Sequence, residues 1–498
     1  MSEKKKIRIP LTRYEWPDER LARMAKRKKI LLNIGIVLLI FSLGFFSHDY
    51  IKPTQNTVIV SEADQGQFDR LKAVYDVLIS DWYFGKDLND LDQQLINEAI
   101  VGMVESTEDP HTVYMTKEEV EQFAQAIDRG FVGIGVSYFD SNGTYVVEKV
   151  FIDSPAYKAG VKAGDIISKV DGVDVYNIGS DVLVDMVRGE ENSVVSIEFI
   201  RGDETVILDI TRAPINNTAF GEMLDEDTAF LEIYQFGSTT ALEVETYLNI
   251  FKENNAKNIL IDLRDNGGGY LNALEDIGSL FLEKGAILIQ QDTTDGERLV
   301  STSKGKVVMD FEDIVILINE NTASAAEVFT AAITENREAT VVGVISYGKG
   351  TVQQQYPFSD GSSLKYTVAE WLTPLGNHIH EVGITPDIIV EQHPIMSRPF
   401  TDLSEDEAYE LDQVHPSIQD AQLSLDFLGY DVKRTDGYYD LSTQEAIQVF
   451  QSSLKMDPNG LVSKELLDAL LSEVVREWHL DNEAKDTQKI EALKLLNE

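Results

Sequence analysis

Apolar strand patterns and helical patterns alternate between Thr228 and Pro394, and this alternation constrains the fold more than any other feature of the chain. The apolar runs that predict buried strands are 230–234, 258–263 and 314–318, and the helical patterns are 240–251 and 271–282. Buried strands that alternate with helices predict an α/β layered domain. Loops at the strand ends are where such a domain carries its functional residues.

The second of these strands runs into a glycine-rich loop, Arg264-Asp265-Asn266-Gly267-Gly268-Gly269. A triple glycine can cradle a phosphate, but no Lys-Ser or Lys-Thr pair follows it, so a nucleotide loop is poorly supported. A glycine turn with exposed N–H groups can serve an oxyanion equally well.

The third strand leads to a small-residue turn that contains Ser324, and a helical pattern follows at 327–333. The free N–H groups of a helix start would stabilise an oxyanion beside this hydroxyl. Lys349 follows between two glycines, which let the backbone bend so that a lysine can point inward. A serine paired with a lysine acts as a nucleophile when the lysine is neutral, so such a site must be dry. Taken singly, Ser324 also fits a helix N-cap and Lys349 a surface lysine.

The chain of 498 residues is long enough for about three domains. Its 43% hydrophobic and 26% charged residues are typical of globular proteins. A net charge of −42 argues against nucleic acid as a partner, because a polyanion would be repelled. Cysteine is absent, which excludes disulfides and cysteine-based metal or nucleophile chemistry.

The N-terminus differs in charge from the rest of the chain. Residues 1–29 carry 11 Lys and Arg against 4 Asp and Glu, and an apolar run follows at 30–46. This pattern predicts a transmembrane helix with a cytoplasmic N-terminus and everything after His48 outside the cell. A cleaved signal peptide, suggested by the small residues at 42–44, and a buried soluble helix are the alternatives.

Residues 65–130 are expected to form a helical region that packs on the α/β domain, because apolar residues recur at helical spacing in 68–83 and 91–105. The two helical patterns end before Asp109-Pro110-His111. His111 is interpreted as a turn residue, with a catalytic base as the alternative.

From about residue 131 to 213 the pattern changes to short strands and glycine turns. The apolar glycine loop with Gly133, Ile134 and Gly135, followed by Ser154-Pro155-Ala156 and Gly164-Asp165-Ile166-Ile167, resembles a PDZ domain. The resemblance implies a small β-barrel-like module that takes up a peptide C-terminus as an added strand. Another small β domain with similar glycines is the alternative.

Four features follow one another along the chain: the PDZ-like module, the 262–269 loop, Thr322-Ala323-Ser324-Ala325-Ala326-Glu327 and Gly348-Lys349-Gly350-Thr351-Val352-Gln353. Together they resemble the C-terminal processing peptidases, or tail-specific proteases, of the membrane-anchored bacterial type. The resemblance covers about 65–390 and implies a serine peptidase domain at 214–395.

Carried over by motif, the resemblance implies Ser324 as nucleophile, Lys349 as general base and Gln353 as the residue that orients the lysine. It also implies an oxyanion hole from the N–H groups of Gly268 and Ala325. Two departures, Thr322 in place of a frequent serine and Asn266-Gly267 in place of a frequent Asn-Pro, affect loop detail.

Arg188 matches a PDZ position that couples the module to the active site in related proteases, so we hypothesise that a docked peptide tail gates the protease through it. His378 and His380 lie two apart and would share one face of a strand, but no third metal ligand is apparent. A structural loop is preferred there, and neither a metal nor another cofactor is expected.

Residues 413–472 follow an acidic linker and resemble the peptidoglycan-binding type 1 domain, a small module of three helices. The resemblance implies binding to the cell wall, with a plain helical spacer as the alternative. The last segment, 483–498, is expected to be a charged helix or a frayed tail.

The chain is therefore expected to be a multidomain α/β protein and a membrane-anchored serine endopeptidase that acts outside the cytoplasm on protein tails. A catalytically idle scaffold that recruits partners through its PDZ and wall-binding modules is the alternative. Association with a second copy of the chain is left open.

Overall fold

The computed structural model describes residues 62–497 except 129, 142, 203, 216 and 481. The basic segment 1–29 and the apolar run 30–46 lie outside these residues, so the membrane anchor stays a prediction. Within the described part, no helix combines the length and the apolar character needed to span a bilayer.

The α/β domain, which carries the candidate catalytic residues, is built on a twisted sheet with the strand order β10-β11-β12-β15-β16-β19. All neighbours in this sheet run parallel except β10 and β11. The prediction of a multidomain α/β fold, with buried strands that alternate with helices, is confirmed. The strands are β10 (Ala219–Met223), β11 (Thr228–Ile233), β12 (Asn258–Asp262), β15 (Ile314–Ile318), β16 (Thr340–Gly343) and β19 (Ile388–Ile389).

Three helices cover one face of this sheet: α7 (Thr240–Glu253), α8 (Leu271–Phe281) and α9 (Ala325–Asn336). Alternate strand residues such as Leu231, Ile261 and Ile316 face these helices in the largest buried apolar cluster. Because successive side chains of a strand point to opposite faces, the residues between them need a second cover.

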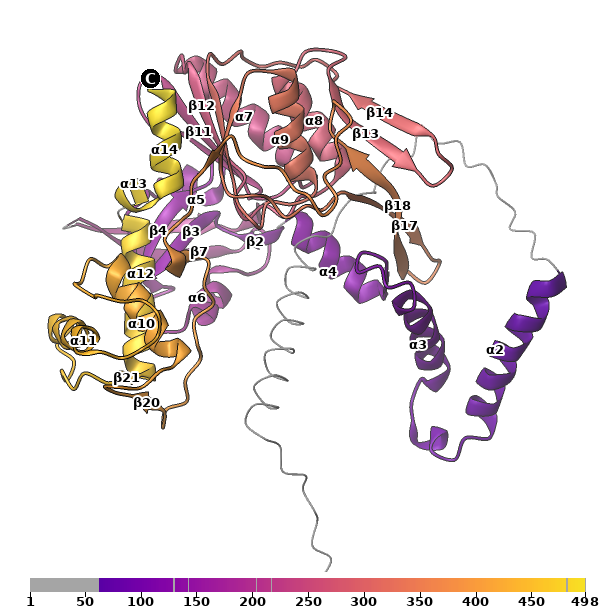
Figure 1. The fold of residues 1–498 in the computed structure, drawn as a ribbon, viewed down its shortest axis with the longest axis horizontal. Helices are drawn as coiled ribbons and strands as arrows, with labels where there is room; N and C mark the ends of the chain where they lie inside the picture. The colour runs from indigo at the N-terminus through magenta and orange to yellow at the C-terminus, as the bar shows by residue number, and fades with distance from the viewer. Residues whose placement is uncertain are drawn as a thin grey trace, which may run out of the picture.

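That second cover is the last helix of the chain, α14 (Thr487–Leu496), which follows the short α13 (Asn482–Lys485). Helix α14 contacts β12, β15 and β16, and Figure 1 shows it on the side of the sheet away from α7, α8 and α9. Its Ala492 and Leu496 are 0% and 5% exposed and pack with Leu260 and Val315 of the sheet. The expected helix is present, whereas the frayed-tail alternative is wrong, because this helix closes an apolar face.

A second, largely antiparallel sheet lies beside the first in the order β1-β18-β13-β14, with β17 paired to β18. Its strands are β1 (Val113–Met115), β13 (Ile287–Thr293), β14 (Arg298–Thr302), β17 (Thr351–Pro357) and β18 (Ser363–Leu372). The pairing of β1 with β18 brings the N-terminal region against the strand hairpin that follows Lys349.

The N-terminal region contains α2 (Glu62–Ser80), the single turn η1 (Gly85–Asp87), α3 (Leu91–Glu105) and α4 (Lys117–Asp128). Apolar side chains at helical spacing predicted α2 and α3, and both helices are confirmed. Many of these side chains are exposed, including Phe68, Leu71 and Val74.

The PDZ module is a sheet in the order β3-β4-β5-β7-β8, with β6 paired to β5. A separate pair joins β2 to β9 where the module meets the catalytic part. The elements are β2 (Phe131–Gly133), β3 (Val136–Ser141), β4 (Thr144–Val150), α5 (Pro155–Ala159), β5 (Ile166–Val170), β6 (Val173–Asp174), α6 (Ser180–Val187), β7 (Val194–Arg201), β8 (Glu204–Thr211) and β9 (Ala213–Ile215).

The C-terminal module has its own apolar core around Ile418, Ile447 and Leu466. Its last helix contacts β3 of the PDZ module, where the His479 ring stacks on Phe139 at 4.7 Å between centroids. The module therefore touches the PDZ domain before the chain returns to the catalytic sheet. Its elements are η2 (Pro394–Met396), β20 (Ala408–Tyr409), α10 (Pro416–Phe427), α11 (Leu441–Ser453), β21 (Val462–Ser463) and α12 (Lys464–Leu480).

Candidate active site

Ser324 caps the N-terminus of α9, directly after the turn that leaves β15. Its φ of 59° and ψ of −121° are unusual for a residue other than glycine. Such strain is held by the surrounding structure and is common where a side chain must be aimed at a substrate. The Ser324 Oγ is buried and has no hydrogen-bond partner within the described residues.

The 262–269 loop lies directly against Ser324. A Cβ added to Gly268 would come within 2.7 Å of the Ser324 Cβ and 2.9 Å of the Ala325 nitrogen. The two residues predicted to supply the oxyanion hole are thus adjacent in space. Ala325 is the first residue of α9, so its N–H has no acceptor within the helix.

In this structure the Gly268 N–H donates to the Asn266 Oδ1 at 2.8 Å. The Asn266 amide is itself held, because its Nδ2 donates to the Ile233 carbonyl. The role of the Gly268 N–H toward an oxyanion therefore stays a prediction.

Lys349 is 1% exposed, although it carries an amine that water would solvate well. Burial lowers the pKa of Lys349 to about 7, against the opposing attraction of the Glu327 and Asp109 carboxylates. A lysine in this range is a competent base near neutral pH. The backbone carbonyl of Lys349 accepts a hydrogen bond from the Trp371 Nε1 at 2.8 Å.

Glu327 joins the serine loop, residues 319–324, to the lysine loop, residues 346–350. Its Oε2 accepts from the Ser324 N–H at 2.8 Å and from the Lys349 N–H at 2.9 Å. Its Oε1 accepts from the Gly348 N–H and from the Ser346 hydroxyl, at 2.7 and 2.6 Å. Burial raises the pKa of Glu327, yet all four partners donate to it, which suits a carboxylate that only accepts.

The sequence analysis assigned no role to Glu327, although a signal for it was present. Ser324-Ala325-Ala326-Glu327 has the spacing of a capping box, in which the acidic side chain returns to the N–H of the capping residue. Here the Glu327 carboxylate also accepts a hydrogen bond from the Lys349 N–H. A capping box, which is a common motif at helix starts, therefore aligns two candidate catalytic residues.

Gln353 lies in β17, two residues beyond Thr351. Its Nε2 donates to the Thr351 Oγ1 at 2.9 Å and to the Thr367 Oγ1 at 3.4 Å. Gln353 is 3% exposed, and its orienting role toward Lys349 stays a prediction.

The turn with Asp109 and His111 approaches the same space from the N-terminal region. Burial, followed by the positive charges of Lys349 and Lys365, lowers the pKa of His111 to about 4. The same effects act on Lys365, whose pKa is lowered to about 6 by burial and by Lys349. His111 thus faces two lysines, which the sequence did not indicate.

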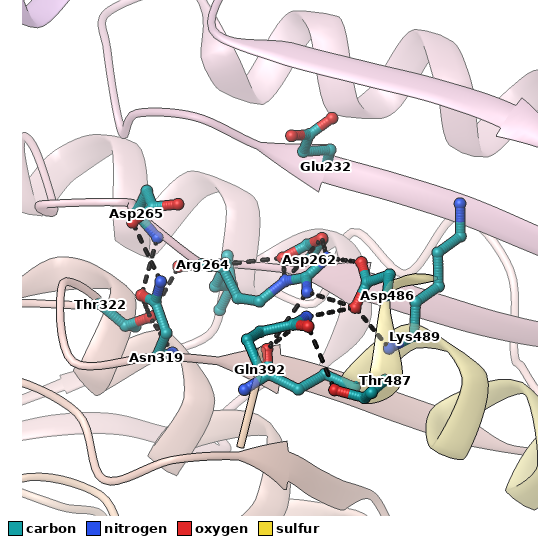
Figure 2. A network of polar contacts seen from close by, with 12 residues as sticks. Glu232, Asp262, Arg264, Asp265, Asn319, Thr322, Gln392, Asp486, Thr487 and Lys489 are labelled. Carbon is teal, nitrogen blue, oxygen red and sulfur yellow. Dashed lines mark hydrogen bonds and ion pairs between the residues drawn. The ribbon is translucent and has the colours of Figure 1, made fainter. Parts of the chain in front are cut away.

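Figure 2 shows how the 262–269 loop is anchored. The Arg264 guanidinium donates to Asp262 on one side and to Asp486, just before α14, on the other. Asp265, which follows, accepts from the Asn319 and Asn321 amides of the serine loop at 3.0 and 2.7 Å. One polar network therefore joins the glycine loop, the serine loop and the C-terminal helix.

The predicted peptide-tail residues lie together at the start of the PDZ module. The Arg188 guanidinium lies 4.5 Å from the centroid of the Phe131 ring, next to Gly133 in β2. Ile134 is buried, and its carbonyl accepts from the Ala156 N–H. Gly135 has a φ of 82° and packs so closely on Ser154 that a Cβ would come within 2.4 Å of the Ser154 Cβ.

The two histidines considered for a metal site, His378 and His380, have different surroundings. His378 lies 3.4 Å from the Glu370 carboxylate, and His380 has a buried Nδ1 without a hydrogen-bond partner. Across the part of the chain that the structure describes, no three His, Cys, Asp or Glu side chains gather as a metal site would require.

A serine at a strained helix start, a buried lysine with a lowered pKa and a PDZ-like module are the features expected of a PDZ-containing serine peptidase. Models of known protein families match successive parts of the chain. Residues 227–390 match peptidase family S41 and 146–201 match the PDZ domain. Residues 414–470 match a putative peptidoglycan binding domain, and 46–119 match the N-terminal domain of the activating protease CtpB.

The chain is 32% identical over 431 residues to the carboxy-terminal processing protease CtpA of Bacillus subtilis (strain 168), covering 86% of this chain and 90% of that protein. It is 31% identical over 438 residues to a probable CtpA-like serine protease of Staphylococcus aureus (strain COL), covering 88% and 86%. The solved photosystem II D1 C-terminal processing protease aligns with 67% of this chain and 94% of that chain, at 22% identity and a TM-score of 0.39.

The chain belongs to the carboxy-terminal processing proteases of peptidase family S41. The predicted resemblances to this family, to a PDZ domain and to a peptidoglycan-binding domain are confirmed.

Proposed function

We propose that this serine-type processing protease cleaves peptide bonds with Ser324 as nucleophile and Lys349 as general base. The observation that carries the proposal is the state of Lys349, which is buried, has a pKa lowered to about 7 and shares the Glu327 carboxylate with Ser324. A base in this range is largely neutral at slightly alkaline pH and can take the serine proton.

In the proposed reaction, neutral Lys349 takes the proton of the Ser324 hydroxyl while Oγ attacks the peptide carbonyl carbon. The carbonyl oxygen becomes an oxyanion, which the Ala325 N–H, together with Gly268, stabilises at the start of α9. The Lys349 ammonium then gives its proton to the leaving amine, and an acyl-enzyme remains. Water attacks the ester with Lys349 again as base, which releases the new carboxyl end and restores Ser324.

The substrates are proposed to be proteins with an accessible C-terminal tail. A PDZ module takes up a terminal strand through backbone hydrogen bonds, and the carboxylate is held by N–H groups of the glycine loop. Gly133, Ile134 and Gly135 form that loop here, and Arg188 lies beside it. Arg188 is proposed to relay tail binding to the catalytic part.

The protein is proposed to be anchored by residues 30–46, with residues 1–29 in the cytoplasm and the protease outside. The basic segment before the apolar run supports this orientation. The α10–α12 module is proposed to bind peptidoglycan, which would place the enzyme between membrane and wall. Should a second copy associate, exposed apolar side chains on α2 and α3 offer it a surface.

The test uses the full chain in detergent micelles with fluorescently labelled casein as an unfolded substrate. Ser324→Ala and Lys349→Met should each lower kcat by at least about 10³-fold, because each removes a group that reacts directly. Lys304→Met is the matched control, since Lys304 forms a surface ion pair with Asp276 in the same domain. Retained turnover in either active-site variant would refute the proposal.

The same assay separates the protease from the idle scaffold. A scaffold would leave casein uncut in the wild-type chain while still binding a C-terminal peptide. A protease should cut casein, and its Ser324→Ala variant should bind the peptide with unchanged affinity and leave the protein whole.

A further inference from the structure

The side-chain amide of Gln353 uses its nitrogen toward two threonines. The Nε2 donates to the Thr351 Oγ1 and to the Thr367 Oγ1, at 2.9 and 3.4 Å. An amide nitrogen has two hydrogens, and both are taken by these contacts. The Oε1 is therefore the atom that the amide has left to accept from another partner.

The direction of the bond at Thr367 is set by a carboxylate. The Thr367 hydroxyl donates to the Asp109 Oδ2 at 2.7 Å. A hydroxyl has a single proton, so its lone pairs are what remains for Gln353. The Gln353 amide must then present its nitrogen to the Thr367 Oγ1. If it presented its oxygen, two acceptor oxygens would face each other without a proton between them.

Asp109 is held so that it can only accept. It receives the Thr112 hydroxyl at 2.6 Å and the His111 N–H at 2.9 Å, besides Thr367. Burial acts to raise the pKa of Asp109, but these hydrogen bonds outweigh it and hold the pKa below its usual value. An ionised carboxylate offers no proton, which fixes the direction of every bond in the chain from Asp109 to Gln353.

These residues come from distant parts of the sequence. Asp109 and Thr112 belong to the turn before β1, and Thr367 lies in β18, to which β1 is paired. The Thr367 N–H donates to the Thr112 Oγ1 at 3.2 Å, so backbone and side chain together tie this turn to β18.

We propose that Asp109 and Thr367 are positioning residues that turn the Gln353 amide so that its Oε1 faces the Lys349 amine. The proposal rests on the proposed roles of Lys349 and Gln353. It makes the N-terminal region a contributor to the active site, because Asp109 sets the polarity of the hydrogen-bond chain behind the base.

Several titratable groups face the lysine. They are Glu327 from α9, Lys365 from β18, and Asp109 and His111 from the turn before β1. Replacing Asp109 removes a negative charge as well as an acceptor, whereas replacing Thr367 removes hydrogen bonds and leaves all these titratable groups in place. Thr367→Val is therefore the decisive variant.

Kinetics of casein cleavage by the full chain would test the proposal. Thr367→Val should lower kcat by on the order of 10²-fold with a KM close to that of the wild type, because a misplaced base slows chemistry rather than binding. Thr367→Ser keeps the hydroxyl and should stay within about three-fold of the wild type. Asp109→Asn should also lose activity, since its amide can donate to Thr367 and reverse the chain.

Asp360→Asn is the matched control. Asp360 lies in the turn of the same β17–β18 hairpin and also accepts a hydroxyl and a backbone N–H, both from Ser362. It should leave kcat unchanged. A merely structural role of Thr367 would instead lower the thermal unfolding midpoint and the amount of active enzyme without moving the pH profile.

The pH profile gives a readout that folding alone does not move. Without an oriented acceptor, the Lys349 ammonium is less stable, so the pH at which kcat/KM rises should shift to lower values in Thr367→Val. Thr367→Ser should keep the wild-type profile. A wild-type kcat and profile in Thr367→Val would overturn the proposal.

A double-mutant cycle tests whether Thr367 acts through Gln353. In a Gln353→Ala background, Thr367→Val should cause little further loss, whereas losses that multiply would overturn the proposal. Turnover retained by Lys349→Met would mean that the proposed function itself is wrong. If Lys349→Met is inactive while Gln353→Ala is fully active, the proposed function stands and this inference fails.

If Thr367→Val folds poorly, Thr112→Val addresses the same chain. It removes a donor to Asp109 and the acceptor of the Thr367 N–H without touching the Thr367 hydroxyl. It should produce a smaller loss of kcat than Asp109→Asn, and a larger loss would contradict the proposed order of contacts.

Discussion

The Arg264 guanidinium makes two parallel hydrogen bonds to the Asp486 carboxylate, at 2.8 and 2.7 Å, across 222 positions of sequence. Arg264 begins the loop that carries Gly268, and Asp486 caps α14 by accepting the Lys489 N–H. The last helix of the chain is thereby joined to a loop of the candidate active site. The C-terminal module lies between the catalytic sheet and this helix in sequence, so it is held to the catalytic part at both of its ends.

Asp486→Ala should destabilise the catalytic part by about 3 kcal/mol, because it removes one partner of an arginine that is only 13% exposed. Urea unfolding and hydrogen exchange of the β12 and β15 amides would measure the loss. Asp227→Ala is the control, because Asp227 pairs with Lys257 in an exposed ion pair, and this variant should lose much less stability. Equal losses in the two variants would contradict the buttressing role of α14.

Gly268→Ala should lower kcat by about 10²-fold or more, because the new Cβ would press on the Ser324 Cβ and the Ala325 nitrogen at a φ of 101°. Gly285→Ala is the control in the same domain. Its φ is 89° and nothing lies within 4 Å of the added Cβ, so it should cost about 1 kcal/mol of stability and leave kcat unchanged. Steady-state kinetics and thermal unfolding distinguish the two effects, and similar kinetics in both variants would argue against close packing at Gly268.

The value of kcat/KM should rise with pH through about 7 and then level off, because neutral Lys349 is the reactive form. Lys349→Arg should be inactive at every pH, since a guanidinium stays charged. Initial rates on casein in buffers of constant ionic strength provide the measurement. A wild-type profile that stays flat through neutral pH would remove Lys349 from the role of base.

Stability should depend on pH through the same lysine. The folded pKa of Lys349, about 7, lies below the ordinary value of 10.5, so the unfolded chain binds more protons between these two values. The free energy of unfolding of the wild type should therefore rise with pH across this window. Lys349→Met lacks this contribution and should show a shallower slope in urea titrations at a series of pH values. Parallel slopes would mean that Lys349 is charged in the folded protein.

His479→Ala should loosen the C-terminal module from the PDZ module. The His479 Nδ1 lies 2.8 Å from the Glu148 Oε1, and its ring stacks on Phe139. Hydrogen exchange of β3 and β4 should accelerate by about ten-fold, equivalent to about 1.4 kcal/mol for a lost hydrogen bond and ring contact. His378→Ala, which removes an exposed histidine near Glu370, should leave these strands unchanged and is the control.

The same contact should weaken in acid. Burial acts to raise the pKa of Glu148, but the His479 hydrogen bond and the Lys149 charge outweigh it and lower the pKa to about 2. Because the folded value lies below the unfolded one, this stabilisation is complete above about 4.5 and is lost as the pH falls toward 2. In His479→Ala the exchange of β3 should therefore respond less to acid than in the wild type.

The sequence by itself determined three central strands and three helices of the catalytic domain, together with its candidate nucleophile and base, but not the second, antiparallel sheet. Apolar periodicity predicted β12 and α7 closely, because burial on one face repeats with the period of each element. The small residues at Ser324 and the glycines around Lys349 are required by the local backbone conformation, so these two positions could also be predicted from the sequence. Even the role of Glu327 had a local signal, three residues after Ser324.

The tertiary structure alone decided which side chains surround the base and which helix closes the sheet. Asp109 and Thr367 are 258 positions apart, and Arg264 and Asp486 are 222 apart, so no periodicity or spacing relates them. α14 was expected to be a charged helix because Lys489, Glu491 and Lys494 interrupt its apolar residues, yet its Ala492 and Leu496 help to cover one face of the sheet. The apolar periodicity of a segment shows which face of that helix or strand is buried. The direction of a hydrogen bond, and the helix that covers a sheet, depend on residues that only folding brings together.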